Sequence, residues 1–172
     1  PIFLKELKTW RERINLTIFA LIGWSIPNIP FMLLNFHGWF NTWVYHENWG
    51  LEDTWLLYLS PNDPVNFPVK ILGFAMMFVV LLHVTFTRRA IVFEEKLLLA
   101  GLSWCIFSYV STPQMALLLL PLFAFERVNK SLFYSSEIAN ALIILTWFTV
   151  SNPITITATP QIASLIRQLI WV

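Results

Sequence analysis

The sequence contains few charged residues. Only 12% of its 172 residues are Asp, Glu, Lys or Arg, whereas 57% are hydrophobic. A soluble domain usually carries about 25% charged residues. This deficit, together with long uncharged runs, indicates an integral membrane protein. The net charge of +1 leaves no basic excess of the kind that nucleic-acid binding requires.

Cysteine and targeting signals are also scarce. Cys105 is the one cysteine in the sequence, so no intrachain disulfide can form. The N-terminal residues lack the pattern of a secretory signal peptide. The sequence opens with Pro1 and stops at Val172 within an apolar run. We expect residues 1–172 to form a single transmembrane domain within a longer chain.

Six apolar runs predict an all-α fold, a polytopic membrane helical bundle with about six spans. A full span needs ~20 residues, so the third, fourth and fifth runs are short. Their polar flanks must contribute, or they are broken helices packed inside protein. The runs cover residues 14–34, 69–86, 97–110, 115–125, 138–150 and 162–172.

Basic residues predict the orientation of these spans. If six spans alternate, nine basic residues fall on one side of the membrane, Lys70 falls on the other, and Arg167 lies within the sixth run. Positive charge concentrates on the cytoplasmic side, so the N-terminus is expected there. Residues 35–68, 111–114 and 151–160 then face outward. The nine residues are Lys5, Lys8, Arg11, Arg13, Arg88, Arg89, Lys96, Arg127 and Lys130.

The long outer loop is rich in aromatic residues and predicts an amphipathic helix over residues 35–48. Its apolar face repeats at three- and four-residue spacing, as on a helix. Indole and phenol rings favour the membrane interface, so the helix could be an anchor. One face could instead line a groove for a polar head group. The residues of the apolar face are Phe36, Trp39, Phe40, Trp43 and Val44.

Several polar residues are candidates for a site. His46, Glu47, Glu52 and Asp53 lie close in sequence on the outer side, where they could hold a divalent cation or perform acid–base chemistry. Acidic residues in an outer loop are also ordinary. Arg167 could pair with a lipid phosphate, because an arginine in the membrane needs a partner, or it could mark the inner end of a short last helix.

Gln114 follows Thr112 and Pro113 at an expected helix start on the outer side. Its amide could donate and accept hydrogen bonds, as sugar hydroxyls require. It could equally be part of a plain turn between two helices. The same tripeptide recurs at residues 159–161, where helix initiation alone explains it, because Thr suits the cap and Pro the first turn.

Residues 107–121 (FSYVSTPQMALLLLP) resemble a segment of GT-C glycosyltransferases, which use polyprenyl-phosphate sugars. The similarity is closest to the mannosyltransferase branches, whose segment typically reads Ser-Pro-Gln-Tyr; here Thr112 and Met115 differ. Residues 28–39 (NIPFMLLNFHGW) and 162–169 (IASLIRQL) are also similar to parts of that family. The resemblance implies an all-helical fold with active-site loops on the extracytoplasmic face.

The resemblance also implies that the catalytic aspartate lies in an earlier outer loop. Asp53 and Asp63 occupy a loop similar to a later one, so the sequence would be the C-terminal half and its catalytic residue stays unassigned. It would transfer a sugar, expected to be mannose, from a lipid-linked donor. Sugar or acceptor would contact His46, Glu52, Asp53 and Gln114, and the phosphate would contact Arg167.

Two other functions fit the residues. A non-catalytic helical subunit of a larger membrane complex would also show broken spans and no identified catalytic aspartate, and it would pack against partner helices. A transporter fragment would show kinked helices at mid-membrane. The near absence of carboxylates within the apolar runs argues against a proton-coupled transporter.

Overall fold

The computed structural model describes residues 2–87, 91–125 and 129–172. Across these three stretches the secondary structure is helical, apart from one isolated β-bridge, so the all-α prediction is confirmed. The chain divides into two compact units, Pro1–Trp49 and Gly50–Val172, each described below by itself. The prediction of a single domain over residues 1–172 stays a prediction.

The first unit contains α1 (Ile2–Glu6), α2 (Trp10–Leu34) and α3 (Phe36–Glu47). Helix α2 begins at a capping box, in which Thr9 and Glu12 each bond the other's backbone N–H. It continues through Pro27 and Pro30, and none of its residues is buried. A 25-residue apolar helix with no protein cover is long enough to cross a bilayer.

Helix α3 confirms the helix expected at residues 35–48. Asn35 ends α2 through its backbone N–H and caps α3 through its side chain, which accepts from the Gly38 N–H at 2.9 Å. The Trp39 indole donates to the Asn28 amide oxygen of α2 at 2.9 Å. Phe36 stacks on Phe40, one turn along. The aromatic side of α3 therefore turns partly back onto the end of α2.

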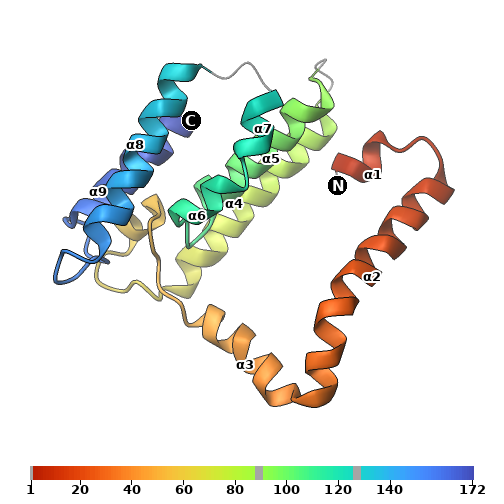
Figure 1. Cartoon of the computed structure of the whole chain (residues 1–172), viewed down its shortest axis with the longest axis horizontal. Coiled ribbons are helices and arrows are strands. Elements are labelled where there is room, and N and C mark those ends of the chain that lie inside the picture. Colours follow the sequence, from red (N-terminus) through yellow and green to blue (C-terminus); the bar gives the residue numbers. More distant parts are fainter. Residues whose placement is uncertain (1, 88–90, 126–128) are drawn as a thin grey trace. The chain divides into compact units, whose positions relative to one another are not determined.

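The second unit pairs its helices as two hairpins (Figure 1). Helices α4 and α5 lie antiparallel, and so do α8 and α9, with the short helices α6 and α7 between the pairs. Its elements are the 3₁₀ helix η1 (Trp55–Leu59), α4 (Phe67–Phe86), α5 (Phe93–Phe107), α6 (Pro113–Leu117), α7 (Leu120–Phe125), α8 (Lys130–Trp147) and α9 (Thr159–Trp171).

Two helices of the described chain, α2 and α4, are long and apolar enough to cross a membrane. The fourth apolar run is divided between α6 and α7, of five and six residues. Helices α5 and α9 have 15 and 13 residues, below the ~17 that a span usually needs.

Three segments that the charge pattern assigns to one side do meet in the second unit. Glu52 pairs with Val110 in the isolated β-bridge, and the Tyr58 hydroxyl donates to the Ile156 carbonyl at 3.1 Å. Leu51, Leu56 and Leu57 form a buried core there, against which Tyr109, Ile154 and Ile156 pack. We call residues 50–59, 108–112 and 151–158 the loop junction.

Two of the nine basic residues assigned to the inner side are described in this unit, and both lie at its other end. Lys96 lies near the start of α5 and Lys130 begins α8, both far from the loop junction (Figure 1). Lys70, the exception in the charge pattern, is buried with its ammonium 5.1 Å from the centre of the Tyr109 ring. Arg88, Arg89 and Arg127 lie outside the described residues.

Gly73 lies where α4 packs closely against its neighbours, which yields a stability prediction. A Cβ atom there would lie 2.5 Å from the Phe107 carbonyl oxygen and 2.6 Å from Leu56 Cδ1. We expect Gly73→Ala to lower the free energy of unfolding by ~1–3 kcal/mol, the usual cost of overpacking. Denaturant unfolding in detergent micelles would measure it.

Gly23→Ala is the matched control, because nothing lies within 4 Å of a Cβ atom at that position in α2. Alanine exceeds glycine in helix propensity by ~1 kcal/mol, so this variant should be as stable as the native protein or more so. Equal stability of the two variants would contradict the close approach at Gly73.

Candidate functional site

Helix α9 presents a polar face to the interior of the second unit. Gln161, Ser164, Arg167 and Gln168 recur at helical spacing, and each is at most 2% exposed. The opposite face is apolar and uncovered: Ile162, Ile166 and Leu169 are 45%, 50% and 67% exposed. This pattern is the reverse of a helix on the surface of a soluble protein.

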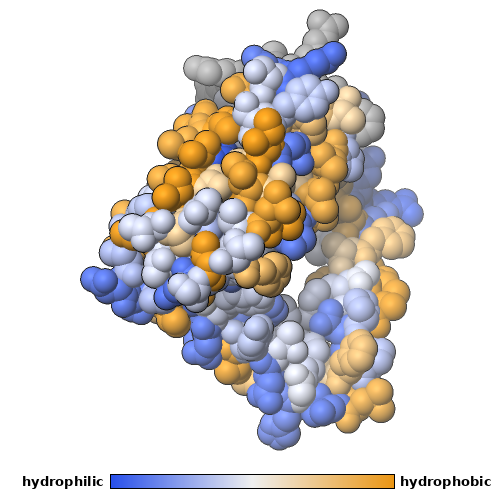
Figure 2. All heavy atoms as spheres, turned by 60° about the vertical axis from the view of Figure 1, so that its left-hand side comes forward, coloured by the Kyte–Doolittle hydropathy of each residue, from blue (hydrophilic) through white to orange (hydrophobic). Residues whose placement is uncertain are grey.

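Helix α8 has a similar inverted arrangement. The arrangement is less complete than in α9: Ser136 and Asn140 are buried together with Ala139 and Ile143, while Ile138, Leu142 and Leu145 are exposed. Figure 2, which brings these two helices forward, shows hydrophobic side chains gathered across the middle of this face. A continuous exposed apolar surface of this kind fits contact with lipid or with another protein.

Arg167 lies at the centre of the buried polar face. Its guanidinium donates to the Asn140 amide oxygen at 2.9 Å, to the Asp53 carbonyl at 3.3 Å, and to both the carbonyl and the hydroxyl of Ser111. The Trp171 ring centre is 4.9 Å away. One side chain thus joins α8, α9 and two segments of the loop junction.

Two glutamines of α9 extend this network to the backbone. Gln161 accepts from the Asp53 N–H at 3.1 Å and donates to the Pro153 carbonyl at 2.9 Å. Gln168 accepts from the Trp55 N–H at 2.7 Å and donates to the Cys105 carbonyl at 3.3 Å. Side chains of α9 therefore hold the segment around Asp53 through the backbone of that segment.

The Asp53 carboxyl group is less well satisfied than its backbone. The residue is 1% exposed, and its Oδ1 atom has no hydrogen-bond partner in the described structure. Its backbone has φ = 52°, a left-handed conformation that Asp tolerates better than most residues. Burial raises the pKa of Asp53 to about 7; nearby Arg167 opposes the shift, and Glu52 adds to it.

The structure brings together two of the five predicted site residues, Asp53 and Arg167. Glu52 lies beside them, half-buried, and its backbone pairs with Tyr109 and Ser111. Gln114 is exposed near the start of α6, at the same end of the unit. His46 is exposed in the other unit and stacks on Trp49, with ring centres 5.4 Å apart.

Arg167 was expected to contact a lipid phosphate and Gln161 only to follow a helix start, and the structure gives both residues partners within the fold. Arg167 is completely buried, so a lipid phosphate would have to displace its present partners, and its predicted phosphate contact stays a prediction. Gln161 does more than follow a helix start, because both ends of its amide are bonded within the fold. The N-cap of α9 is Ala158 rather than Thr159.

Sequence reasoning missed Asn140, Ser111, Gln161 and Gln168 as members of this cluster. One signal could have found part of it: the polar residues of α9 repeat every three or four positions within an apolar run.

The described residues do not form a metal centre. Among them, no three His, Cys, Asp or Glu side chains come close enough together to hold an ion. The divalent cation considered for His46, Glu47, Glu52 and Asp53 therefore has no ligand set in this part of the chain.

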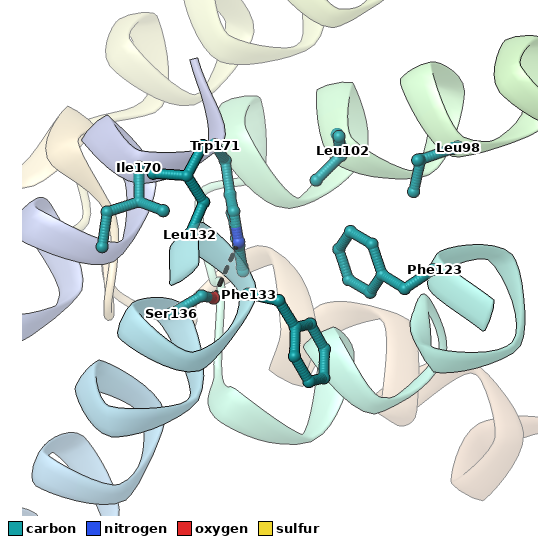
Figure 3. A pocket seen from close by; sticks show the side chains of 8 residues that line it. All are labelled: Leu98, Leu102, Phe123, Leu132, Phe133, Ser136, Ile170 and Trp171. Atoms are coloured by element: carbon teal, nitrogen blue, oxygen red, sulfur yellow. Dashed lines mark hydrogen bonds between the residues drawn. The ribbon is translucent and has the colours of Figure 1, made fainter. Parts of the chain in front are cut away.

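An apolar pocket of about 120 Å³ lies beside the polar cluster (Figure 3). Its two polar groups satisfy each other, since the Trp171 indole donates to the Ser136 hydroxyl at 2.9 Å. The pocket thus offers packing surface and no free polar group. It is lined by Leu98, Leu102, Phe123, Leu132, Phe133, Ser136, Ile170 and Trp171.

The bonding of Arg167 predicts a large stability effect. We expect Arg167→Ala to lower the free energy of unfolding by at least about 3 kcal/mol, because each buried acceptor left unpaired costs ~1–3 kcal/mol. The control is Ile166→Ala on the exposed face of the same helix, which should cost about 0.5 kcal/mol. Denaturant unfolding in micelles compares them, and a native-like Arg167→Ala would rule out the bonding role.

No protein-family model, curated protein or solved structure matches this chain.

Proposed function

We propose that this chain is part of an integral membrane glycosyltransferase. It would transfer a sugar, expected to be mannose, from a polyprenyl-phosphate donor to an acceptor at the extracytoplasmic face. The chain would cross the bilayer about six times, with a cytoplasmic N-terminus, α3 at the outer interface and the loop junction facing outward.

The observation that carries the membrane part of the proposal is the inverted polarity of α8 and α9. Neither helix is among the two long apolar candidates, yet α9 turns its apolar side chains outward and its polar ones inward, and α8 buries Ser136 and Asn140 while it exposes Leu142 and Leu145. Burying Arg167, Gln161 and Gln168 costs free energy unless their hydrogen bonds are made inside the protein. A hydrocarbon environment favours this arrangement for short helices that share their polar atoms.

The loop junction supports the catalytic part. Residues 107–121, which carry the GT-C resemblance, pass directly through it, and Ser111 and Pro113 are buried there. Gln114 follows on an exposed position, where its amide is accessible to a substrate. A sugar transferase needs such polar groups on the face where its lipid-linked donor is presented.

The topology can be tested by cysteine labelling. Asn48 and Lys130 are both exposed, and the native Cys105 is buried. In sealed cells we expect an impermeant maleimide to label Asn48→Cys but not Lys130→Cys, and to label both once the membrane is permeabilised. Equal labelling in sealed cells would exclude the proposed orientation.

The catalytic role can be tested at Gln114. We expect Gln114→Ala to reduce lipid-linked sugar transfer by the intact protein about ten- to a hundredfold, because a hydrogen bond to the reacting sugar contributes ~1–3 kcal/mol. The matched control is Asn62→Ala, another exposed amide on the same side of the unit. Gln161→Ala is not a suitable control, because Gln161 is buried and structural.

The second candidate is a non-catalytic helical subunit of a larger membrane complex. The complete burial of Arg167 favours it, since this arginine is occupied inside the fold. For such a subunit, Gln114→Ala and Asn62→Ala would leave sugar transfer unchanged at matched expression and thermal stability. That result would replace the enzyme proposal with this one.

A further inference from the structure

Two buried polar atoms of the described residues have no hydrogen-bond partner, Asp53 Oδ1 and Arg167 Nε, and both lie at the loop junction. The backbone N–H of Asp53 is bound by Gln161, and its carbonyl accepts from Arg167 and Gln168. Its Oδ1 atom has no hydrogen-bond partner among the described residues, although Asp53 is only 1% exposed to solvent. The helix holds the main chain of Asp53 and leaves its carboxyl oxygen unbonded.

The groups that act on the Asp53 carboxyl group, directly or through Arg167, come from its own segment and from α5, α8 and α9. Glu52 is adjacent in the chain and repels an ionised Asp53, whereas Arg167 of α9 attracts it. The Cys105 thiol of α5 and the Glu137 carboxylate of α8 act on the same Arg167. Arg167 partly compensates a negative charge on Asp53, but its guanidinium donates to the Asp53 carbonyl oxygen.

From this geometry we infer that Asp53 is a proton-operated latch on the loop junction. As the neutral acid it stays in the cluster and keeps residues 50–54 against α9. As the carboxylate it moves into water, because a buried charge with an unbonded oxygen costs far more than a neutral carboxyl group. Opening would expose Arg167, which the closed junction buries completely. The inference depends only on the fold and holds whether or not the protein transfers sugar.

The expected direction follows from proton linkage. In the closed state the pKa of Asp53 is raised from 3.8 to about 7, mainly by burial. The open state, with Asp53 in water, releases its proton near the lower value. The free energy that favours the closed state is therefore largest below about pH 4 and decreases as the pH rises toward 7. Above about pH 7 it no longer changes with pH.

Hydrogen exchange of the intact protein in detergent micelles tests the latch. After correction for intrinsic rates, we expect backbone amides of residues 50–56 and 108–112 to open at least about tenfold more at pH 8 than at pH 5.5. Asp53→Asn should protect both segments equally at the two pH values, because Asn mimics the neutral acid and also tolerates a positive φ. Asp63→Asn, at an exposed position in the same loop, should behave as the native protein does.

Two results would overturn the latch: pH-independent exchange in the native protein, or pH-dependent exchange that survives in Asp53→Asn. If Asp53→Asn does not fold, Glu52→Gln supplies the test. Removing that neighbouring charge should lower the pKa of Asp53 and move the opening transition to lower pH. A transition that stays in place or moves to higher pH contradicts the latch.

Discussion

The buried guanidinium of Arg167 is the interaction on which the second unit depends. It reaches acceptors on α8, on the Asp53 segment and on the Ser111 segment at once. These groups are distant in the sequence, with Asn140 27 positions away and Asp53 114 positions away. Because a guanidinium carries five donors in a rigid fork, one residue can do what would otherwise require several polar side chains.

The position of Arg167 also explains why the short helices of this unit can keep polar residues inward. The buried amides of Asn140, Gln161 and Gln168 and the hydroxyl of Ser136 each bond a group on another element, so the polar cost of burial is offset inside the protein. The outward faces are then left for apolar side chains such as Ile166 and Leu145. This arrangement supports the proposal that α8 and α9 lie in a membrane, although neither is among the two helices that length and composition identify.

Local features of the fold could be predicted, and long-range ones could not. Helix α3 was predictable because its aromatic spacing and its Asn35 cap are encoded within a few residues. The division of the fourth run into α6 and α7 was not, since Met115 to Pro121 reads as one apolar stretch. Within the site, Arg167 stood out as a charge within an apolar run, and Asp53 was one of several candidate acidic residues of the outer loop. Gln161 and Asn140 did not, because their partners lie on elements whose proximity only the fold reveals.

Helix α9 binds the loop junction mainly through the main chain of that junction. Gln161, Gln168 and Arg167 form hydrogen bonds with backbone N–H and C=O groups. Every amino acid supplies such groups, except that proline has no backbone N–H. The backbone atoms belong to Asp53, Trp55, Cys105, Ser111 and Pro153. The exposed side chains of these segments therefore contribute little to holding the loops in place. Related chains could exchange them freely and acquire different surface chemistry on an unchanged scaffold.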